Sequence, residues 1–344
     1  MKKERVMVGI ILLFFSTCLV PATVQCHEAL PSASRGSWLY VGGSGSGNYT
    51  KIQDAIGNAS EGDTVFVFDE SSPYVENIVI DVSITLLGED KETTIINGST
   101  NTSGENFTDY IGVWITTDNV TVRGFTIQGC NLSGIYIIAN HTNISDTILS
   151  DNEYYGIVMG SNNSIQPFEM MVHDNMITNN LILRNMIGIF VSGQNNLIRE
   201  NVISQKIMGI VVMFSISNNI SHNIITKEAS AGVYISGSYN TVLYRNNISY
   251  NGEGVYAMMT SADKILQNNF IKNNKSAESN QLIFNLFYYK YKGEIPYPIR
   301  RNVWNGNYWD RPRSFPYKSP GFLRFFVDWH PAQEPYDIPD IRDA

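Results

Sequence analysis

Glycine followed by a β-branched residue recurs along the chain at a nearly constant spacing. The glycines of these pairs are Gly112, Gly134, Gly156, Gly188, Gly209, Gly232 and Gly254. A second series lies out of phase with the first and consists of Asn180, Asn201, Asn223, Asn246 and Asn268. Both series have intervals of 21 to 23 residues, apart from one glycine interval of 32. We therefore predict stacked repeats of about 22 residues, one of which carries extra residues near 166–175.

Each repeat contains three short strand patterns separated by turns. In one repeat they are residues 188–191, 196–198 and 201–203, with isoleucine and valine at most apolar positions. Three strands and three turns in about 22 residues form one coil of a parallel β-helix. A leucine-rich repeat of the same length would need a leucine frame that these coils lack. The predicted fold class is therefore all-β, a single-stranded right-handed parallel β-helix.

Stacking at about 4.8 Å per coil places equivalent residues of successive coils above one another. An asparagine at a turn can then hydrogen-bond to the asparagines of the neighbouring coils, which predicts an asparagine ladder. The repeated glycine is expected to supply the backbone freedom that a tight corner needs.

Alternation along the glycine-led strand separates inward from outward side chains. The first and third residues after glycine are aliphatic and should fill the bore. The second residues should point away from it, and we call them the outward file: Trp114, Tyr136, Val158, Phe190, Val211, Tyr234 and Tyr256. An exposed apolar stripe of this size is typical of a binding surface. The predicted ligand-binding residues, for a glycan or a surface protein, are Trp114, Tyr136, Phe190, Tyr234 and Tyr256.

Two alternatives to this binding surface stay open at the level of sequence. The C-terminal segment is rich in aromatic residues and could fold back over the outward file, which would make the file a second core. The outward rings could also be scattered, singly exposed side chains.

The two ends of the predicted β-helix (36–275) need closing, because an open coil exposes unpaired backbone. A short amphipathic helix near 50–57 is expected to cover the first coil, with Thr50 as N-cap and Gln53 completing a capping box. After residue 275 the repeat stops, and 276–344 is predicted to be an aromatic C-terminal cap that includes Trp304, Tyr308 and Trp309.

The N-terminus has the pattern of a signal peptide. Lys2, Lys3 and Arg5 precede an apolar run over 6–20, which is short for a membrane span. We predict a signal peptide over 1–26, with an uncleaved membrane anchor as the alternative, and hence a secreted or extracytoplasmic cell-surface protein. Thirteen Asn-x-Ser/Thr sequons agree with export and suggest a glycoprotein.

Composition excludes several classes of protein. Only 16% of the 344 residues are charged, and the net charge is -8, or -10 once residues 1–26 are removed. An acidic chain argues against nucleic-acid binding, which needs basic surface. Beyond residue 26 the only cysteine is Cys130, which excludes a disulfide framework and a cysteine-based zinc site.

Several segments resemble known β-helix proteins. Residues 49–56, 62–67, 74–80 and 84–88 are similar to the opening of pectin-lyase-like right-handed β-helix proteins, and the coils resemble the repeats of carbohydrate-binding proteins and sugar hydrolases. Residues 305–310 and 327–331 are similar to the C-terminal end of NosD-like β-helix proteins, which are exported in archaea and bacteria. The NosD resemblance implies a role in supplying copper to an extracytoplasmic enzyme. The fold itself hosts lyases, hydrolases, epimerases and plain surface proteins.

Catalytic residues are not evident in the coils. A hydrolase needs two or three carboxylates on one face, and a lyase or epimerase needs a base, usually beside calcium or a charge that neutralises a uronate. Acidic residues are sparse, and Asp151 and Asp174 are separated by the extra residues of the long repeat. We therefore predict a non-catalytic protein that binds glycans or a protein partner. The first alternative, which the NosD resemblance implies, is an accessory protein in copper-enzyme maturation. The second is a polysaccharide lyase, hydrolase or epimerase, and calcium is not excluded.

One segment has the composition of a copper site. Met170, Met171, His173 and Met176 lie in the extra residues of the long repeat, and thioethers with an imidazole suit Cu(I). Methionine is also common core filler, so we predict no cofactor and keep these four residues as copper candidates. The other histidines after residue 26 (His27, His141, His222 and His330) do not cluster in the sequence.

Overall fold

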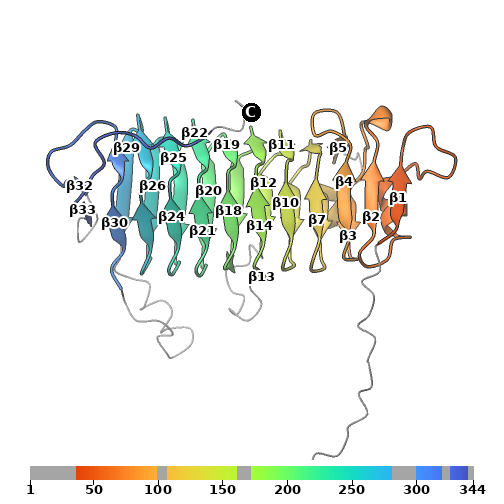
Figure 1. Ribbon diagram of the computed structural model, residues 1–344, viewed down its shortest axis with the longest axis horizontal. Coiled ribbons are helices and arrows are strands. Elements are labelled where there is room, and N and C mark those ends of the chain that lie inside the picture. The colour runs from red at the N-terminus through yellow and green to blue at the C-terminus, as the bar shows by residue number, and fades with distance from the viewer. Residues whose placement is uncertain (1–35, 99–106, 161–171, 281–299, 320–325, 340–344) are drawn as a thin grey trace, which may run out of the picture. The chain divides into compact units, whose positions relative to one another are not determined.

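The computed structural model describes residues 36–98, 107–160, 172–280, 300–319 and 326–339. They belong to one compact unit within 35–344 and form three parallel sheets, A, B and C, that the chain visits in turn (Figure 1). Sheet A contains β1 (Trp38–Val41), β2 (Thr64–Val67), β4 (Thr85–Gly88), β7 (Thr121–Arg123), β10 (Asn143–Ser145), β14 (Met176–Thr178), β18 (Leu197–Arg199), β21 (Asn219–Ser221), β24 (Val242–Tyr244), β27 (Lys264–Leu266) and β30 (Val303–Asn305).

Sheets B and C have nine strands each. Sheet B contains β5 (Ile95–Asn97), β8 (Thr126–Gln128), β11 (Ile148–Ser150), β15 (Leu181–Leu183), β19 (Val202–Ser204), β22 (Ile224–Thr226), β25 (Asn247–Ser249), β28 (Asn269–Ile271) and β31 (Tyr308–Trp309). Sheet C contains β3 (Ile78–Ile80), β6 (Ile111–Ile115), β9 (Ser133–Ile137), β12 (Tyr155–Met159), β16 (Ile187–Val191), β20 (Met208–Met213), β23 (Ala231–Ser236), β26 (Glu253–Met258) and β29 (Lys275–Asn280).

The remaining described elements are short. They are α1 (Ile52–Ile56), the 3-10 helices η1 (Asp69–Ser71) and η2 (Phe107–Tyr110), the parallel pair β13 (Val172–His173) and β17 (Gly193–Gln194), and the antiparallel pair β32 (Tyr317–Ser319) and β33 (Phe326–Asp328).

The predicted β-helix is confirmed, with about 22 residues per coil. Within sheet C, Ile135 pairs with Val113 of the previous coil and Ile157 of the next, and all three are fully buried in the bore. The explanation expected for the repeated glycine is wrong, because these glycines do not have a positive φ. A Cβ on Gly134 would lie 2.9 Å from the carbonyl oxygen of Gly156, and one on Gly188 would lie 2.6 Å from that of Gly209. Glycine is needed there because the backbones of successive coils approach closely.

The predicted asparagine ladder is confirmed at the corner between sheets A and B. It runs through Asn180, Asn201, Asn223, Asn246, Asn268 and Asn307, all at most 1% exposed. From Asn201 onward, each Oδ1 accepts the backbone N–H of the previous asparagine at 2.9 to 3.0 Å and its side-chain amide at 2.9 to 3.1 Å. Asp328 ends the ladder by accepting from the backbone and side-chain amides of Asn307.

Two further ladders, which the sequence did not reveal, occupy the other corners. The corner between sheets B and C uses Asn152, Asn185, Gln205, Glu228, Asn251 and Asn273, and the corner between sheets C and A uses Asn175, Asn196, Asn218, Asp263 and Asn302. Each of these side chains accepts the backbone N–H of a residue in the previous coil. Buried polar backbone is thus satisfied at all three corners.

The cap of helix α1 differs from the expected capping box. Lys51 precedes the helix, and no side chain of the local segment caps it. The carboxylate of Glu76 instead accepts the backbone N–H groups of Ile52 (2.9 Å) and Gln53 (3.1 Å). The Gln53 amide pairs with both backbone groups of Val79, so it ties the helix to the first strand of sheet C.

At the other end, aromatic rings cover the last coil. The ring of Trp309 stacks on Tyr317 at 3.8 Å between centroids, and Trp304 stacks on Phe326 at the same distance. Both tryptophans are buried, and Trp309 Nε1 donates to Asp328. Tyr308 remains partly exposed. The aromatic residues near 284–291, which could have covered the outward file, lie outside the described residues.

Candidate functional site

The strand register places the outward file on one face of sheet C. Trp114 pairs with Tyr136, Phe190 with Val211, and Tyr234 with Tyr256, and each lies on the side of the strand opposite to the bore. Exposure along the file is uneven, because Tyr136, Val158 and Val211 are at most 5% exposed. Trp114, Phe190, Tyr234 and Tyr256 are partly exposed. Direction away from the bore therefore does not by itself make a side chain accessible.

The first part of the file forms a small second core. Tyr136 and Val158 pack with Ile111, and Trp114 borders this cluster. The ring of Phe107 lies edge-to-face over Trp114 and Tyr136, with centroid distances of 6.0 and 5.6 Å. Tyr136 offers no free ring face in this arrangement, so a ligand-binding role for it stays a prediction.

The last part of the file combines stacked rings with charges. The rings of Tyr234 and Tyr256 stack with centroids 5.6 Å apart and an interplanar angle of 29°. Glu278 follows Tyr256 in the same file, and Lys275 forms ion pairs with Glu278 and Glu253. Burial raises the pKa of Tyr256, and the nearby Glu278 carboxylate adds to this shift. Tyr256 therefore stays neutral near pH 7 and can donate a hydrogen bond.

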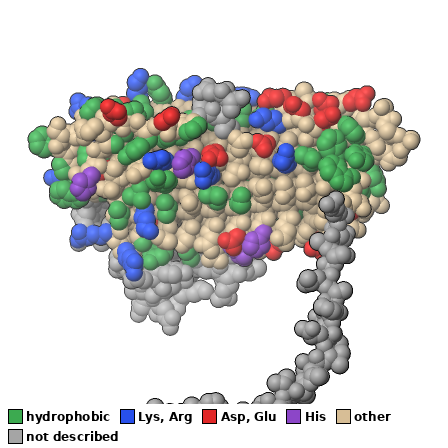
Figure 2. Space-filling view, viewed as in Figure 1, with side chains coloured by type: hydrophobic (Ala, Val, Ile, Leu, Met, Phe, Trp, Pro, Cys, Tyr) green, Lys and Arg blue, Asp and Glu red, His purple; other side chains and the backbone are tan. Residues whose placement is uncertain are grey.

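A second aromatic patch, which the sequence did not reveal, lies on sheet A at the first coils. It consists of Trp38, Tyr40, Phe66 and Phe68, whose rings lie 5.0 to 6.2 Å apart. Trp38 is 53% exposed and Tyr40 is 42% exposed. Figure 2 shows hydrophobic side chains gathered over this end of the stack. The alternation of aromatic and aliphatic residues over 38–41 and 65–68 was the available signal.

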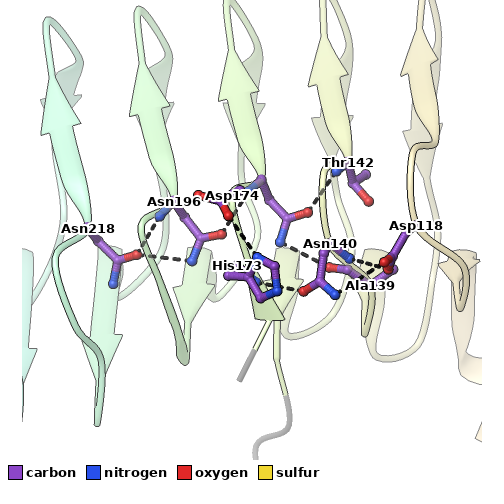
Figure 3. A network of polar contacts seen from close by, with 9 residues as sticks. Asp118, Ala139, Asn140, Thr142, His173, Asp174, Asn196 and Asn218 are labelled. Carbon is purple, nitrogen blue, oxygen red and sulfur yellow. Dashed lines mark hydrogen bonds and ion pairs between the residues drawn. The ribbon is translucent and has the colours of Figure 1, made fainter. Parts of the chain in front are cut away.

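The long repeat brings two histidines, His141 and His173, and an aspartate, Asp174, together at the corner between sheets C and A. Figure 3 shows His173 and Asp174 at this corner. Possible ligand atoms of His141, His173 and Asp174 all lie within 4.8 Å of one another. The imidazole rings are 5.4 Å apart and nearly perpendicular, and His173 Nδ1 lies 2.8 Å from Asp174 Oδ2. His141 was missed because it lies 32 residues before His173, but that is also the spacing of Gly156 and Gly188.

Polar contacts between coils hold this corner in place. The backbone N–H of His173 donates to Asn140 Oδ1 at 2.9 Å, and the backbone N–H of Asn140 donates to Asp118 Oδ1 at 2.8 Å. Behind them, the ladder through Asn175 and Asn196 anchors the turn. The two imidazoles are thus carried on neighbouring coils with a fixed register.

Other residues singled out in the sequence are not brought together. Met170 and Met171 lie outside the described residues, and Met176 is 42% exposed on β14. Asp151 lies at the corner between sheets B and C, where it forms an ion pair with Arg184 at 2.6 Å, so it does not stack with Asp174. The Arg184 guanidinium lowers the pKa of Asp151, which keeps this carboxylate charged.

Several sequons present an accessible asparagine. Asn119, Asn131, Asn219 and Asn274 are exposed, whereas the side-chain oxygens of Asn143 and Asn247 are buried. Glycan occupancy stays a prediction that mass spectrometry of tryptic peptides can check. Residues 1–26 lie outside the described residues, so the signal peptide also stays a prediction. Among the described helices, none is long and apolar enough to cross a membrane.

Three parallel sheets, stacked coils and amide ladders define the class of protein as a right-handed parallel β-helix. Solved structures with the same fold include XylC in complex with xylose (TM-score 0.54, 13% identity, 70% of this chain and 67% of that one) and pectate lyase Pel9A (TM-score 0.52, 13% identity, 80% of both chains). The A-module of the mannuronan C-5 epimerase AlgE4 from Azotobacter vinelandii is similar to the same degree (TM-score 0.52, 15% identity, 75% of this chain and 83% of that one). At these identities the likeness shows the fold alone.

Comparison of the sequence with known proteins indicates which β-helix proteins this chain resembles. Residues 168–314 match the family model described as "Periplasmic copper-binding protein (NosD)". A cell surface glycoprotein of Methanothermus fervidus is 31% identical over 314 residues, covering 76% of this chain and 51% of the relative. The chain thus spans about half the length of that curated relative. The predicted resemblance to NosD-like and pectin-lyase-like β-helix proteins is confirmed.

Proposed function

We propose that this chain acts outside the cytoplasm, at the cell surface, where it binds a polysaccharide at the Tyr234–Tyr256 end of the outward file. The single observation that carries the proposal is this stacked, partly exposed pair of rings beside Glu253, Lys275 and Glu278. The similarity to a cell surface glycoprotein supports the location, and the ligand class rests on the chemistry of the surface itself.

The chemistry of the surface suits a sugar chain. Tyrosine combines an apolar ring face with a hydroxyl group, so it can contact the C–H face of a sugar and also hydrogen-bond to it. Carboxylates of Glu253 and Glu278 accept hydrogen bonds from sugar hydroxyls, and the ammonium group of Lys275 donates them. Because successive rings follow the axis of the coils, the surface suits an extended polymer better than a compact ligand.

A glycan array identifies the sugar, and a titration with Tyr234→Ala and Tyr256→Ala tests the surface. We expect each substitution to weaken binding about tenfold, as for a ring that contributes about 1.4 kcal/mol. Tyr244→Ala is the matched control, because Tyr244 is a partly exposed tyrosine on β24 of sheet A. Equal affinity of the wild-type protein and both file variants would contradict the proposal.

Catalysis on a polysaccharide is the first alternative function. Incubation of the protein with uronate polymers tests it, since a hydrolase generates new reducing ends and a lyase generates unsaturated products. Either product would replace binding by turnover as the function of this surface. We expect neither, because the two carboxylates that the structure describes at this end of the file, Glu253 and Glu278, both form ion pairs with Lys275.

Copper handling is the second alternative, and the description of the matching family model favours it. A soft Cu(I) site would need several thioethers. Among the four copper candidates, the structure describes only Met176 and His173, so the methionine site stays a prediction. The donors that the structure does bring together are two imidazoles and a carboxylate, which suit a harder cation.

A further inference from the structure

The geometry points to a binding site for a divalent transition-metal ion, formed by His141, His173 and Asp174. We propose that Cu²⁺ binds there most tightly and that Zn²⁺ and Ni²⁺ bind more weakly. This inference is independent of glycan binding on sheet C, because it concerns a different corner of the coils.

The fold preorganises the two histidines. The backbone N–H of His141 donates to the carbonyl of His173 at 3.3 Å, so the coils that carry the two residues are bonded directly at this point. His141 has a left-handed backbone with φ of 53°, and Asp174 has φ of 57° at the equivalent place in the next coil. The side chains of His141 and Asp174 are consequently stacked one coil apart, with His173 beside them.

The ligand atoms have a suitable arrangement. All three lie within 4.8 Å of one another, and small side-chain rotations would bring them to the distances of about 2.0 to 2.2 Å from a shared ion that imidazole and carboxylate ligands adopt. Asp174 Oδ2 lies 2.8 Å from His173 Nδ1. Without an ion this contact orients the imidazole, and an ion that takes the place of the shared proton would be bound by His173 Nδ1 and Asp174 Oδ2 together.

Charge and access also favour a cation. Asp174 and Asp118 place two carboxylates at this corner, and within the described part of the chain neither has a Lys or Arg ion-pair partner. The His173 side chain is 35% exposed and that of Asp174 is 45% exposed, so an ion can enter from solvent. In Figure 2, histidine and acidic side chains lie side by side at this edge of the stack.

Donor chemistry selects the ion. Imidazole suits copper, zinc and nickel, whereas magnesium and calcium prefer oxygen ligands. Among divalent first-row ions, affinity for a given nitrogen and oxygen site is highest for Cu²⁺. Two imidazoles and one carboxylate therefore favour Cu²⁺ over both Ca²⁺ and Cu(I).

The test is a titration of the full-length chain with Cu²⁺, followed by calorimetry and by electron paramagnetic resonance. We expect one tight equivalent whose spectrum shows coordination by nitrogen. His141→Asn and His173→Gln should each weaken this binding by roughly tenfold or more. His222→Asn is the matched control, because His222 also has a left-handed backbone, with φ of 58°, but lies at the corner between sheets A and B.

Unchanged binding in both His141→Asn and His173→Gln would overturn the proposal. So would loss of the tight equivalent in Met170→Leu and Met171→Leu while His141→Asn keeps it, because the methionines would then hold the metal. Circular dichroism of each variant shows whether it is folded, and the His141→Asn/His173→Gln double variant measures background binding by the remaining histidines. A glycan titration of the same double variant should match the wild type, which separates this site from the surface on sheet C.

Discussion

The corner between sheets A and B and the corner between sheets C and A solve the same structural problem in different ways. At the first, six buried asparagines follow one another without a break from Asn180 to Asn307. At the second, threonine replaces asparagine at Thr142 and Thr241, an acid replaces it at Asp263, and the long repeat adds residues between β12 and β13.

The difference shows where this fold leaves room for chemistry. An asparagine side chain is neutral and offers both a donor and an acceptor, so a continuous ladder satisfies the backbone and leaves no free polar group. Where the ladder is interrupted, side chains of other types occupy the corner. The His141–His173–Asp174 group lies at this variable corner, in agreement with the tendency of functional sites to depart from the regular pattern.

Breaking the continuous ladder should have the largest effect. Asn223 accepts hydrogen bonds from both amides of Asn201 and donates to the carbonyl of Ile198. Asn223→Ala removes these hydrogen bonds and leaves the buried backbone N–H of Asn201 without an acceptor, whereas the Asn201 side-chain amide still donates to two backbone carbonyls. Because each lost partner of a buried group costs about 1–3 kcal/mol, we expect a loss of roughly 3 kcal/mol in the free energy of unfolding. Urea denaturation followed by circular dichroism measures it.

Thr142→Ala supplies the contrast at the variable corner. The Oγ1 of Thr142 has no hydrogen-bond partner. The backbone N–H of residue 142 donates to Asn175 Oδ1, and the substitution keeps this N–H. We expect a loss below about 1 kcal/mol. Equal losses for Asn223→Ala and Thr142→Ala would show that the two corners contribute equally to the free energy of unfolding. The proposed difference between the corners would then be wrong.

The acid at the variable corner should make stability depend on pH. Burial raises the pKa of Asp263 to about 8, whereas an unfolded aspartate has a pKa near 3.9. Between these two pKa values the folded chain keeps a proton on Asp263 that the unfolded chain has lost. The stabilising contribution of this proton to the free energy of unfolding is therefore complete below about pH 4 and disappears as pH rises to about 8. Asp263→Asn should remove this loss and raise the free energy of unfolding at pH 8.5 by on the order of 2 kcal/mol.

Urea midpoints of the wild type and Asp263→Asn at pH 5 and pH 8.5 check this expectation. Glu228, whose pKa burial raises to about 8, gives an independent case at the corner between sheets B and C, where Glu228→Gln should behave in the same way. Wild-type and variant midpoints that shift in parallel with pH would show that the buried acids do not account for the pH dependence.

The smallest effect is expected for the proposed metal ligand itself. His141 is exposed, and asparagine tolerates the left-handed backbone that this residue adopts. In the presence of a chelator, His141→Asn should change the free energy of unfolding by no more than about 0.5 kcal/mol. A larger loss would mean that His141 stabilises the corner between sheets C and A. The difference between the two corners would then be one of structure and not of function.

One ladder was predictable from the sequence because asparagine recurs in each successive coil from Asn180 to Asn307. The other two were missed because Gln205, Glu228 and Asp263 accept the same backbone N–H groups with different side chains. The cap of helix α1 was missed for a related reason, since Glu76 is 24 residues from Ile52 and only the stacked coils bring them together.

The sequence by itself determined the period of the coils, the strands of each coil and the side chains that face the bore, because these follow from local alternation and repetition. Only the tertiary structure decided which outward rings are covered, since Phe107 closes over Tyr136 while Tyr234 and Tyr256 stay partly open. It also decided which polar residues meet across coils, because the extra residues of the long repeat shift the sequence spacing of His141 and His173 without shifting their places in space.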